Sequence, residues 1–234
     1  MNQAHLWRAG KLLGSAPPLR ALIHALALAI LVALSCVSAR ASEQTVLVVY
    51  GDSLSAGFGL SEAQTFPVRL ESALKARGHA VRVVNVSVSG DTTAAGLARF
   101  EWSFPKGADG AILELGANDA LRGLRPDITR ANLDKLLIRI KAKGAEPLLT
   151  GMLAPRNLGR EYTEAFDRIY PELAKKHGVL LYPFFLFDVA GKRKLNQADG
   201  LHPNPAGIDK IVAQMVPIVE QLLTRIAAHR STTQ

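Results

Sequence analysis

This sequence of 234 residues contains few sulfur-bearing side chains: one cysteine, Cys36, and three methionines. A single thiol cannot form an intramolecular disulfide, and it supplies too few thiolates for a structural zinc site. Aromatic residues are also scarce, at 6% of the chain, whereas apolar residues in total make up 48%. A domain built from this sequence must therefore be stabilised mainly by the packing of aliphatic side chains.

Acidic residues are absent from the first 41 positions. Residues 1–20 are basic, residues 21–37 are almost wholly apolar, and Ala39-Arg40-Ala41 then places small side chains at both positions that a signal peptidase reads. This order is typical of a secretory signal peptide. We therefore predict cleavage after Ala41 and a periplasmic or secreted protein. The alternative is an uncleaved membrane anchor, although the apolar run is shorter than the roughly 20 residues that a span requires.

Loss of the predicted signal peptide would also change the composition. It removes Cys36 and four of the 28 basic residues, which leaves 24 basic and 20 acidic side chains in residues 42–234. A net charge of +4 spread along that length is typical of a solvated surface and does not indicate a nucleic-acid partner. We expect residues 42–234 to form one domain, monomeric and without a stable membrane span.

The rest of the chain alternates short apolar runs with longer amphipathic ones, which predicts βαβ units around a parallel sheet. The fold class expected is α/β, a three-layer α/β/α sandwich with about five strands. The predicted strands are residues 45–50, 80–86, 111–115, 147–150 and 179–181, and the predicted helices are 64–77, 92–100, 127–143, 161–177 and 205–228. Two long irregular stretches, 151–160 and 182–204, are candidates for functional loops.

Ser53 directly follows the first apolar strand, in the run Val49-Tyr50-Gly51-Asp52-Ser53. In an open α/β sheet ligands bind at the carboxyl ends of the strands, so this hydroxyl is a candidate nucleophile. Ser55 stands where the Gly-x-Ser-x-Gly elbow requires its second glycine, which argues against the standard α/β-hydrolase fold. The nearby glycines match neither a dinucleotide-binding fingerprint nor a P-loop, so no nucleotide cofactor is expected.

His202 is the best candidate for a general base, because imidazole accepts protons near neutral pH. Asp199 lies three residues earlier and can orient the ring, while Gly200 and Pro203 predict that the pair lies in a turn. Taken alone, an Asp-x-x-His spacing is more often a surface ion pair.

Gly90 and Asn118 also follow predicted strands, and they are candidate donors to an oxyanion, together with the backbone N–H of Ser53. Each residue also has an ordinary structural role as the alternative: Gly90 as a turn glycine and Asn118 as a helix cap. Asp52, Asp91 and Asp119 lie beside these positions, but their Ser, Thr and Asn neighbours favour loop capping over metal binding. We therefore expect no metal.

Four segments together resemble the sequence blocks of the GDSL, or SGNH, hydrolase family, and specifically its group of periplasmic acyl-CoA thioesterases, lysophospholipases and arylesterases. They are Gly51-Asp52-Ser53-Leu54-Ser55, Ser89-Gly90-Asp91-Thr92, Gly116-Ala117-Asn118-Asp119 and Asp199-Gly200-Leu201-His202-Pro203. The similarity runs from about Thr45 to Leu222. Ala117 departs from the pattern, since a second glycine is expected before the asparagine.

The resemblance implies a flavodoxin-like strand order, no metal, and a Ser53, Asp199 and His202 triad. It also implies an oxyanion hole formed by the N–H groups of Ser53 and Gly90 and by the side chain of Asn118. The activity implied is hydrolysis of esters and thioesters of apolar acyl groups through an acyl-enzyme.

Two loops that follow the third and fourth strands are candidates to line a groove for an apolar acyl chain: Leu121-Arg122-Gly123-Leu124 and Met152 to Tyr162. The candidate substrate-binding residues in them are Leu121, Arg122, Leu124, Pro155 and Arg156. Arg122, Arg156 and Arg160 are candidates to meet a phosphate of a lysophospholipid or of coenzyme A, with solvated loop charges as the equal alternative. Phe184, Phe185 and Phe187 are either part of the groove or part of the core. Two other functions stay open, a carbohydrate O-acetyl esterase and a non-catalytic periplasmic binding module.

Overall fold

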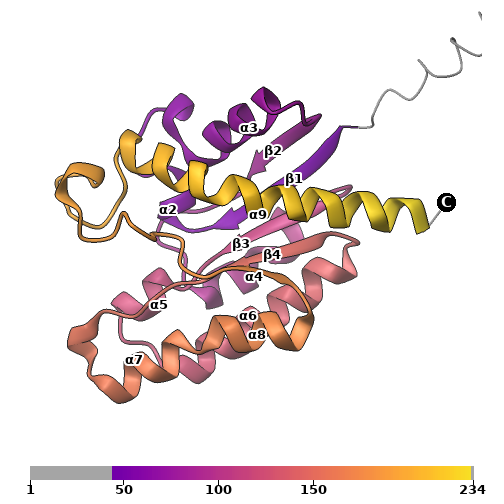
Figure 1. Ribbon diagram of the computed structural model, residues 1–234. Coiled ribbons are helices and arrows are strands. Elements are labelled where there is room, and N and C mark those ends of the chain that lie inside the picture. The colour runs from indigo at the N-terminus through magenta and orange to yellow at the C-terminus, as the bar shows by residue number, and fades with distance from the viewer. Residues whose placement is uncertain (1–43, 233–234) are drawn as a thin grey trace, which may run out of the picture. The chain divides into compact units, whose positions relative to one another are not determined.

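The computed structural model describes residues 44–232. The predicted signal peptide over residues 1–41, including Cys36, lies outside the described residues. Within them the chain forms a single parallel sheet covered by helices on both faces (Figure 1).

The sheet has five strands in the order β2-β1-β3-β4-β5. They are β1 (Thr45–Gly51), β2 (Val81–Asn85), β3 (Gly110–Glu114), β4 (Glu146–Thr150) and β5 (Leu180–Tyr182). All four pairings are parallel, and Val48 of β1 lies opposite Val84 on one side and Ala111 on the other. The predicted five-stranded flavodoxin-like sheet is confirmed.

Two helices cover one face of the sheet and three cover the other (Figure 1). The helices α3 (Phe66–Ala76) and α9 (Pro205–Thr232) pack together on the first face, and α4 (Thr93–Ser103), α6 (Pro126–Ala142) and α8 (Ile169–His177) form the second layer. Strand β1 lies inside the sheet, between β2 and β3, and its residues 47–51 are buried, which explains why residues 46–50 are continuously apolar.

Within residues 44–232, α9 alone is long and apolar enough to cross a membrane by length and composition. Its apolar side is instead buried in the core, through Ile208, Ile211, Met215, Val219 and Leu222. Helix α9 is therefore a core helix of the first layer and packs over β3, β4 and β5.

The single helix predicted over residues 161–177 is wrong, because the chain forms two helices there, α7 (Arg160–Asp167) and α8. Pro171 lies in the first turn of α8. It has no N–H to donate to the carbonyl of Asp167, and its ring would clash with that carbonyl in a continuous helix. The break at Arg168 places Pro171 where a helix tolerates it.

Short helices that the sequence did not predict occur at the functional edge of the sheet. They are α2 (Ser53–Ala56) directly after β1, α5 (Ala117–Leu121) after β3, and the 3-10 turns η1 (Glu62–Gln64), η2 (Arg156–Leu158) and η3 (Arg193–Leu195). The strand order reverses between β1 and β3, and such a switch point opens a crevice at the carboxyl edge. Helices α2 and α5 begin at that point.

Candidate active site

Ser53 is placed by an abrupt change from strand to helix. Strand β1 ends at Gly51, the side chain of Asp52 accepts a hydrogen bond from the N–H of Leu54 at 3.0 Å, and Ser53 is the first residue of α2. A Cβ on Gly51 would lie 2.1 Å from the Ser55 Oγ atom and 2.5 Å from the Glu114 carbonyl oxygen, so only glycine fits. The turn sets the Ser53 hydroxyl in the wall of a cavity.

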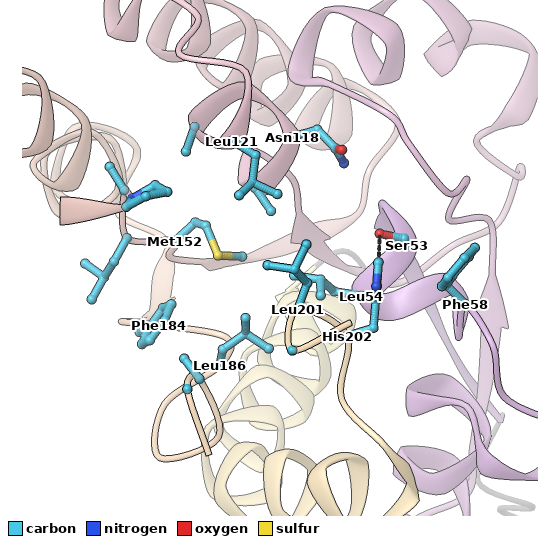
Figure 2. A pocket seen from close by; sticks show the side chains of 18 of the residues that line it. Ser53, Leu54, Phe58, Asn118, Leu121, Met152, Phe184, Leu186, Leu201 and His202 are labelled. Carbon is cyan, nitrogen blue, oxygen red and sulfur yellow. Dashed lines mark hydrogen bonds between the residues drawn. The ribbon is translucent and has the colours of Figure 1, made fainter. Parts of the chain in front are cut away.

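Ser53, His202 and Asp199 form a continuous hydrogen-bonded chain. The Nε2 atom of His202 lies 2.9 Å from the Oγ atom of Ser53, and its Nδ1 atom lies 2.6 Å from the Oδ2 atom of Asp199 (Figure 2). An ionised Asp199 accepts a hydrogen bond from the Nδ1–H group of His202, which leaves the lone pair of Nε2 directed at the serine hydroxyl. This is the arrangement of a nucleophile, a base and an orienting acid.

The Asp199 carboxylate is held in its ionised form. Its second oxygen accepts hydrogen bonds from the N–H groups of Leu201 and His202 at 2.9 and 3.0 Å. These backbone donors, with that of His202 first, and the His202 ring lower the pKa of Asp199 to about 2. The predicted turn is present, because residues 199–202 lie in an irregular segment outside helix and strand.

Gln197 ties this loop to the rest of the site. Its backbone N–H donates to the His202 carbonyl at 2.8 Å, and its side-chain amide donates to the carbonyl of Phe58 at 2.7 Å. The loop that carries the imidazole is thus fixed both internally and against the chain just after α2.

The two other candidate oxyanion donors line the same cavity as Ser53. Gly90 has a φ angle of +87°, a left-handed conformation that suits glycine, and Asn118 lies in the first turn of α5. The N–H groups of Ser53 and Gly90 donate to no atom within residues 44–232. The Asn118 amide donates to the Oδ2 atom of Asp52 at 3.2 Å and to the Asp91 carbonyl at 3.0 Å, which fixes its direction.

Two carboxyl groups are fully buried behind Ser53. Burial raises the pKa of Asp52 to about 7, against the lowering effect of its bonds to Leu54 and Asn118. Burial and then the charge of Asp52 raise the pKa of Glu114 well above its usual range. Glu114 Oε2 accepts from the Ser55 hydroxyl at 2.8 Å, whereas Oε1 has no partner among the described residues. This wall of the site therefore disfavours negative charge.

The remaining aspartates of the three loops have structural partners. Asp91 pairs with Arg99 at 2.5 Å, and the Arg99 guanidinium also lies 4.1 Å from the centroid of the Tyr50 ring. Asp119 accepts hydrogen bonds from the N–H and hydroxyl of Thr93. In residues 44–232, no group of three or more His, Cys, Asp and Glu side chains is placed to hold a metal ion.

The cavity beside Ser53 has a volume of about 690 Å³ and a mostly apolar lining. Besides the residues already named, its lining includes Leu54, Phe58, Ala117, Ala120, Leu121, Met152, Leu153, Ala154, Pro155, Arg156, Phe184, Leu186 and Leu201. Figure 2 shows Met152, Phe184 and Leu186 gathered on one side of the Ser53–His202 pair and Phe58 on the other. A cavity of this size and composition suits an apolar ligand.

Of the five residues predicted to bind substrate, Leu121, Pro155 and Arg156 line the cavity, and Arg122 and Leu124 do not. The Arg122 side chain instead donates to the Gly90 carbonyl at 3.1 Å. The backbone carbonyl of Leu124 accepts the Tyr162 hydroxyl at 2.7 Å. The structure thus places these two residues outside the cavity lining, since neighbours in sequence on a short helix and turn point in different directions.

Of the basic and aromatic candidates for substrate binding, some line the cavity and others do not. Arg156 lines the cavity and pairs with Asp167 at 2.7 Å, while Arg160 pairs with Glu164 at the surface. Phe184 lines the cavity, whereas Phe185 is buried in the core against Phe66 with the two rings edge to face. Phe187 is exposed and outside the lining.

Sequence reasoning missed several residues of the site, and Phe58 is the most informative of them. Its ring centroid lies 4.6 Å from that of His202. The signal available in the sequence was an aromatic residue between two glycines, Gly57 and Gly59, directly after the serine block. Leu186 and Leu201 carried no such signal, because single aliphatic residues in loops are common on protein surfaces.

Comparison with known proteins gives a consistent set of relatives. Residues 49–210 match the model of the GDSL-like Lipase/Acylhydrolase family. "Esterase TesA" of Pseudomonas aeruginosa is 40% identical over 202 residues, which cover 86% of this chain and all of that protein. "Thioesterase 1/protease 1/lysophospholipase L1" of Escherichia coli K12 is 42% identical, over 77% of this chain and 88% of the relative. A solved structure titled "Crystal Structure of TesA" superposes with a TM-score of 0.72 at 39% identity, covering 76% of this chain and 99% of that one.

Proposed function

The chain belongs to the GDSL-like lipase/acylhydrolase family and is a serine esterase and thioesterase, and on this basis we propose that Ser53, His202 and Asp199 are its catalytic triad. Small-molecule carboxylic esters are its substrates. The observation that carries the assignment of roles is the hydrogen-bonded chain from Ser53 through His202 to Asp199, with links of 2.9 and 2.6 Å.

In the proposed acylation step, Nε2 of His202 takes the hydroxyl proton of Ser53 as Oγ bonds to the carbonyl carbon of the ester or thioester. The carbonyl oxygen becomes an oxyanion. Collapse of this intermediate breaks the bond to the alcohol or thiol, which leaves with the proton from Nε2. Water then gives a proton to the same nitrogen and attacks the acyl-enzyme. The acid departs, and Ser53 regains its proton.

The proposed oxyanion hole consists of the N–H groups of Ser53 and Gly90 and the amide of Asn118. Both backbone donors are unengaged within the described chain, and the Asn118 amide is oriented by Asp52 and Asp91. In the reaction one amide N–H of Asn118 would exchange its present acceptor for the oxyanion. The two backbone donors are already unengaged and held in place, so they can stabilise the transition state without reorganising.

For the acyl group we propose an apolar chain bound among Leu121, Met152, Phe184 and Leu186. The 690 Å³ cavity is large enough for a chain of several methylenes and offers few polar partners. A carbohydrate O-acetyl esterase would gain nothing from this apolar volume. A series of p-nitrophenyl esters tests the proposal, with kcat/KM rising from acetyl to medium chains. A maximum at acetyl, with activity on acetylated xylan, would favour the carbohydrate esterase instead.

The nucleophile is tested by Ser53→Ala with a fluorophosphonate probe, which phosphonylates an activated serine. Labelling and p-nitrophenyl butyrate hydrolysis should both disappear in this variant. The matched control is Ser72→Ala, an exposed serine on α3 whose hydroxyl donates only within its own helix. Unchanged hydrolysis by a folded Ser53→Ala protein would overturn the assignment. Labelling that persists in it would place the reactive serine elsewhere.

We further propose that the protein is exported, with residues 1–41 removed and residues 42–234 forming one monomeric domain without a membrane span. The basic, apolar and small-residue order of the first 41 positions supports this proposal. N-terminal sequencing of protein from the periplasmic fraction should begin at Ser42, and light scattering should give the mass of one copy. Recovery in the membrane fraction with the N-terminus intact would contradict it.

A further inference from the structure

We propose that Phe58 selects the leaving group of the ester, by stacking its ring on an aromatic alcohol while the acyl chain occupies the opposite side of the site. The inference rests on the proposed roles of Ser53 and His202. It adds a second, aromatic recognition element on the side from which the alcohol departs.

The first observation is the placement of the Phe58 ring. It packs against the His202 ring with the centroids 4.6 Å apart and the planes inclined by 37°. Its side chain nevertheless stays half exposed, at 51%, although it lines the same cavity as Ser53. One part of the ring contacts the imidazole, and the remainder is open to a ligand.

The backbone around Phe58 is built to hold the ring in this position. Gly57 and Gly59 have φ angles of +88° and +73°, which side chains other than glycine rarely adopt. The N–H of Phe58 donates to the Ser53 carbonyl at 3.2 Å, and its carbonyl accepts from the Gln197 amide at 2.7 Å. Since the backbone N–H of Gln197 also donates to the His202 carbonyl, one residue sets both rings relative to each other.

The chemistry of the reaction places the leaving group on this side. The departing oxygen takes its proton from Nε2 of His202, so the alcohol must leave beside that ring. Figure 2 shows the Ser53–His202 pair between Phe58 on one side and the apolar group of Met152, Phe184 and Leu186 on the other. Consider an ester whose carbonyl carbon lies at the Ser53 hydroxyl and whose acyl chain lies among Met152, Phe184 and Leu186. Its alcohol part then lies on the side of Phe58.

An aromatic alcohol is the class that gains most from this ring. Aromatic pairs in offset or tilted contact contribute about 0.5–1.5 kcal/mol beyond the burial of area, which corresponds to roughly a two- to tenfold change in kcat/KM. A saturated ring of the same size gains the burial alone. The alternative role for Phe58, as a cover that only positions His202, predicts the same loss for every leaving group.

The experiment compares benzyl butyrate with cyclohexylmethyl butyrate. Both have the same acyl group and a primary alkoxide leaving group, and they differ in the aromaticity of the ring. In Phe58→Leu, we expect kcat/KM to fall roughly two- to tenfold for the benzyl ester and to change by less than about twofold for the saturated ester. Phe58→Trp should retain the preference for the benzyl ester. Phe187→Leu removes an exposed ring outside the cavity and is the matched control.

Equal losses on both esters, with a shifted pH profile of kcat/KM, would overturn the proposal in favour of positioning of His202. No loss on either ester would overturn it as well. Hydrolysis of the saturated ester by the parent protein, abolished in Ser53→Ala, reports separately on the proposed nucleophile. A failure of the Phe58 proposal is thus distinguishable from a failure of the catalytic assignment.

Discussion

The two walls of the site shift the pKa of carboxyl groups in opposite directions. Behind Ser53, at the edge of the sheet, burial raises the pKa of Asp52 to about 7 and that of Glu114 well above its usual range. On the irregular loop opposite, the half-exposed Asp199 has its pKa lowered to about 2 by backbone and imidazole hydrogen bonds. The same functional group is pushed toward its neutral form on one wall and its charged form on the other.

This difference suits the proposed chemistry. A carboxylate beside the imidazole stabilises the positive charge that the base acquires, and the backbone and imidazole hydrogen bonds keep it ionised. A full negative charge behind the nucleophile would instead oppose the oxyanion that develops near Asn118. The sheet supplies a wall that disfavours such a charge, while the loop supplies the one charge that the mechanism uses.

The largest effect is expected on the loop wall, from His202→Ala. Without the imidazole no group within reach takes the Ser53 proton, so kcat/KM for p-nitrophenyl butyrate should fall by about 10⁴-fold or more. The matched control is His177→Ala, whose ring pairs with Asp134 on the far side of the fold. Retention of a tenth of the activity by a folded His202→Ala protein would contradict the proposed base.

On the sheet wall, Asn118→Ala should lower kcat by about 10²–10³-fold with little change in KM, because the amide contacts the oxyanion only in the transition state. Asn157→Ala, at an exposed position of η2, provides the control. Steady-state kinetics on a medium-chain ester separates the two parameters. A loss confined to KM would assign Asn118 to substrate binding.

Glu114→Gln tests the sheet wall of the site through the pH dependence of protein stability. The raised pKa of Glu114 means that the folded state holds this proton at a pH where the unfolded chain has released it, so stability falls as pH rises above about 4. Between pH 5 and 9, urea unfolding should show wild-type protein losing more stability than Glu114→Gln. Parallel pH dependences of the two proteins would show that Glu114 does not titrate in this way.

Asp199→Asn should give the smallest effect on stability and the opposite sign of pH dependence. The lowered pKa of Asp199 means that its contribution is present above the unfolded pKa of about 4 and is lost as pH falls toward 2. At pH 7 the variant should be less stable by under about 1 kcal/mol, since the group is half exposed. Unfolding curves of the two proteins should converge near pH 2, and a difference that grows in acid would refute this account.

The sequence was most informative where local chemistry and topology agree. The alternation of apolar runs predicted the five parallel strands, and the carboxyl ends of β1, β2 and β3 predicted where Ser53, Gly90 and Asn118 would lie. The sequence was least informative about the direction in which individual side chains point. Arg122 follows Leu121 directly, yet its side chain turns to the Gly90 carbonyl while Leu121 lines the cavity. The break before α8 depended on one proline within an otherwise continuous helical pattern.

By itself, the sequence determined the order of strands and helices, the serine at the first strand end, and the Asp-x-x-His turn near the far end. These features depend on periodicity, turn residues and spacing, which act over a few residues. Only the tertiary structure brought Ser53 within 2.9 Å of His202, which is 149 positions away, and packed the Phe58 ring against the His202 ring. It also raised the pKa of Asp52, because burial is a property of the packed fold and not of the residue.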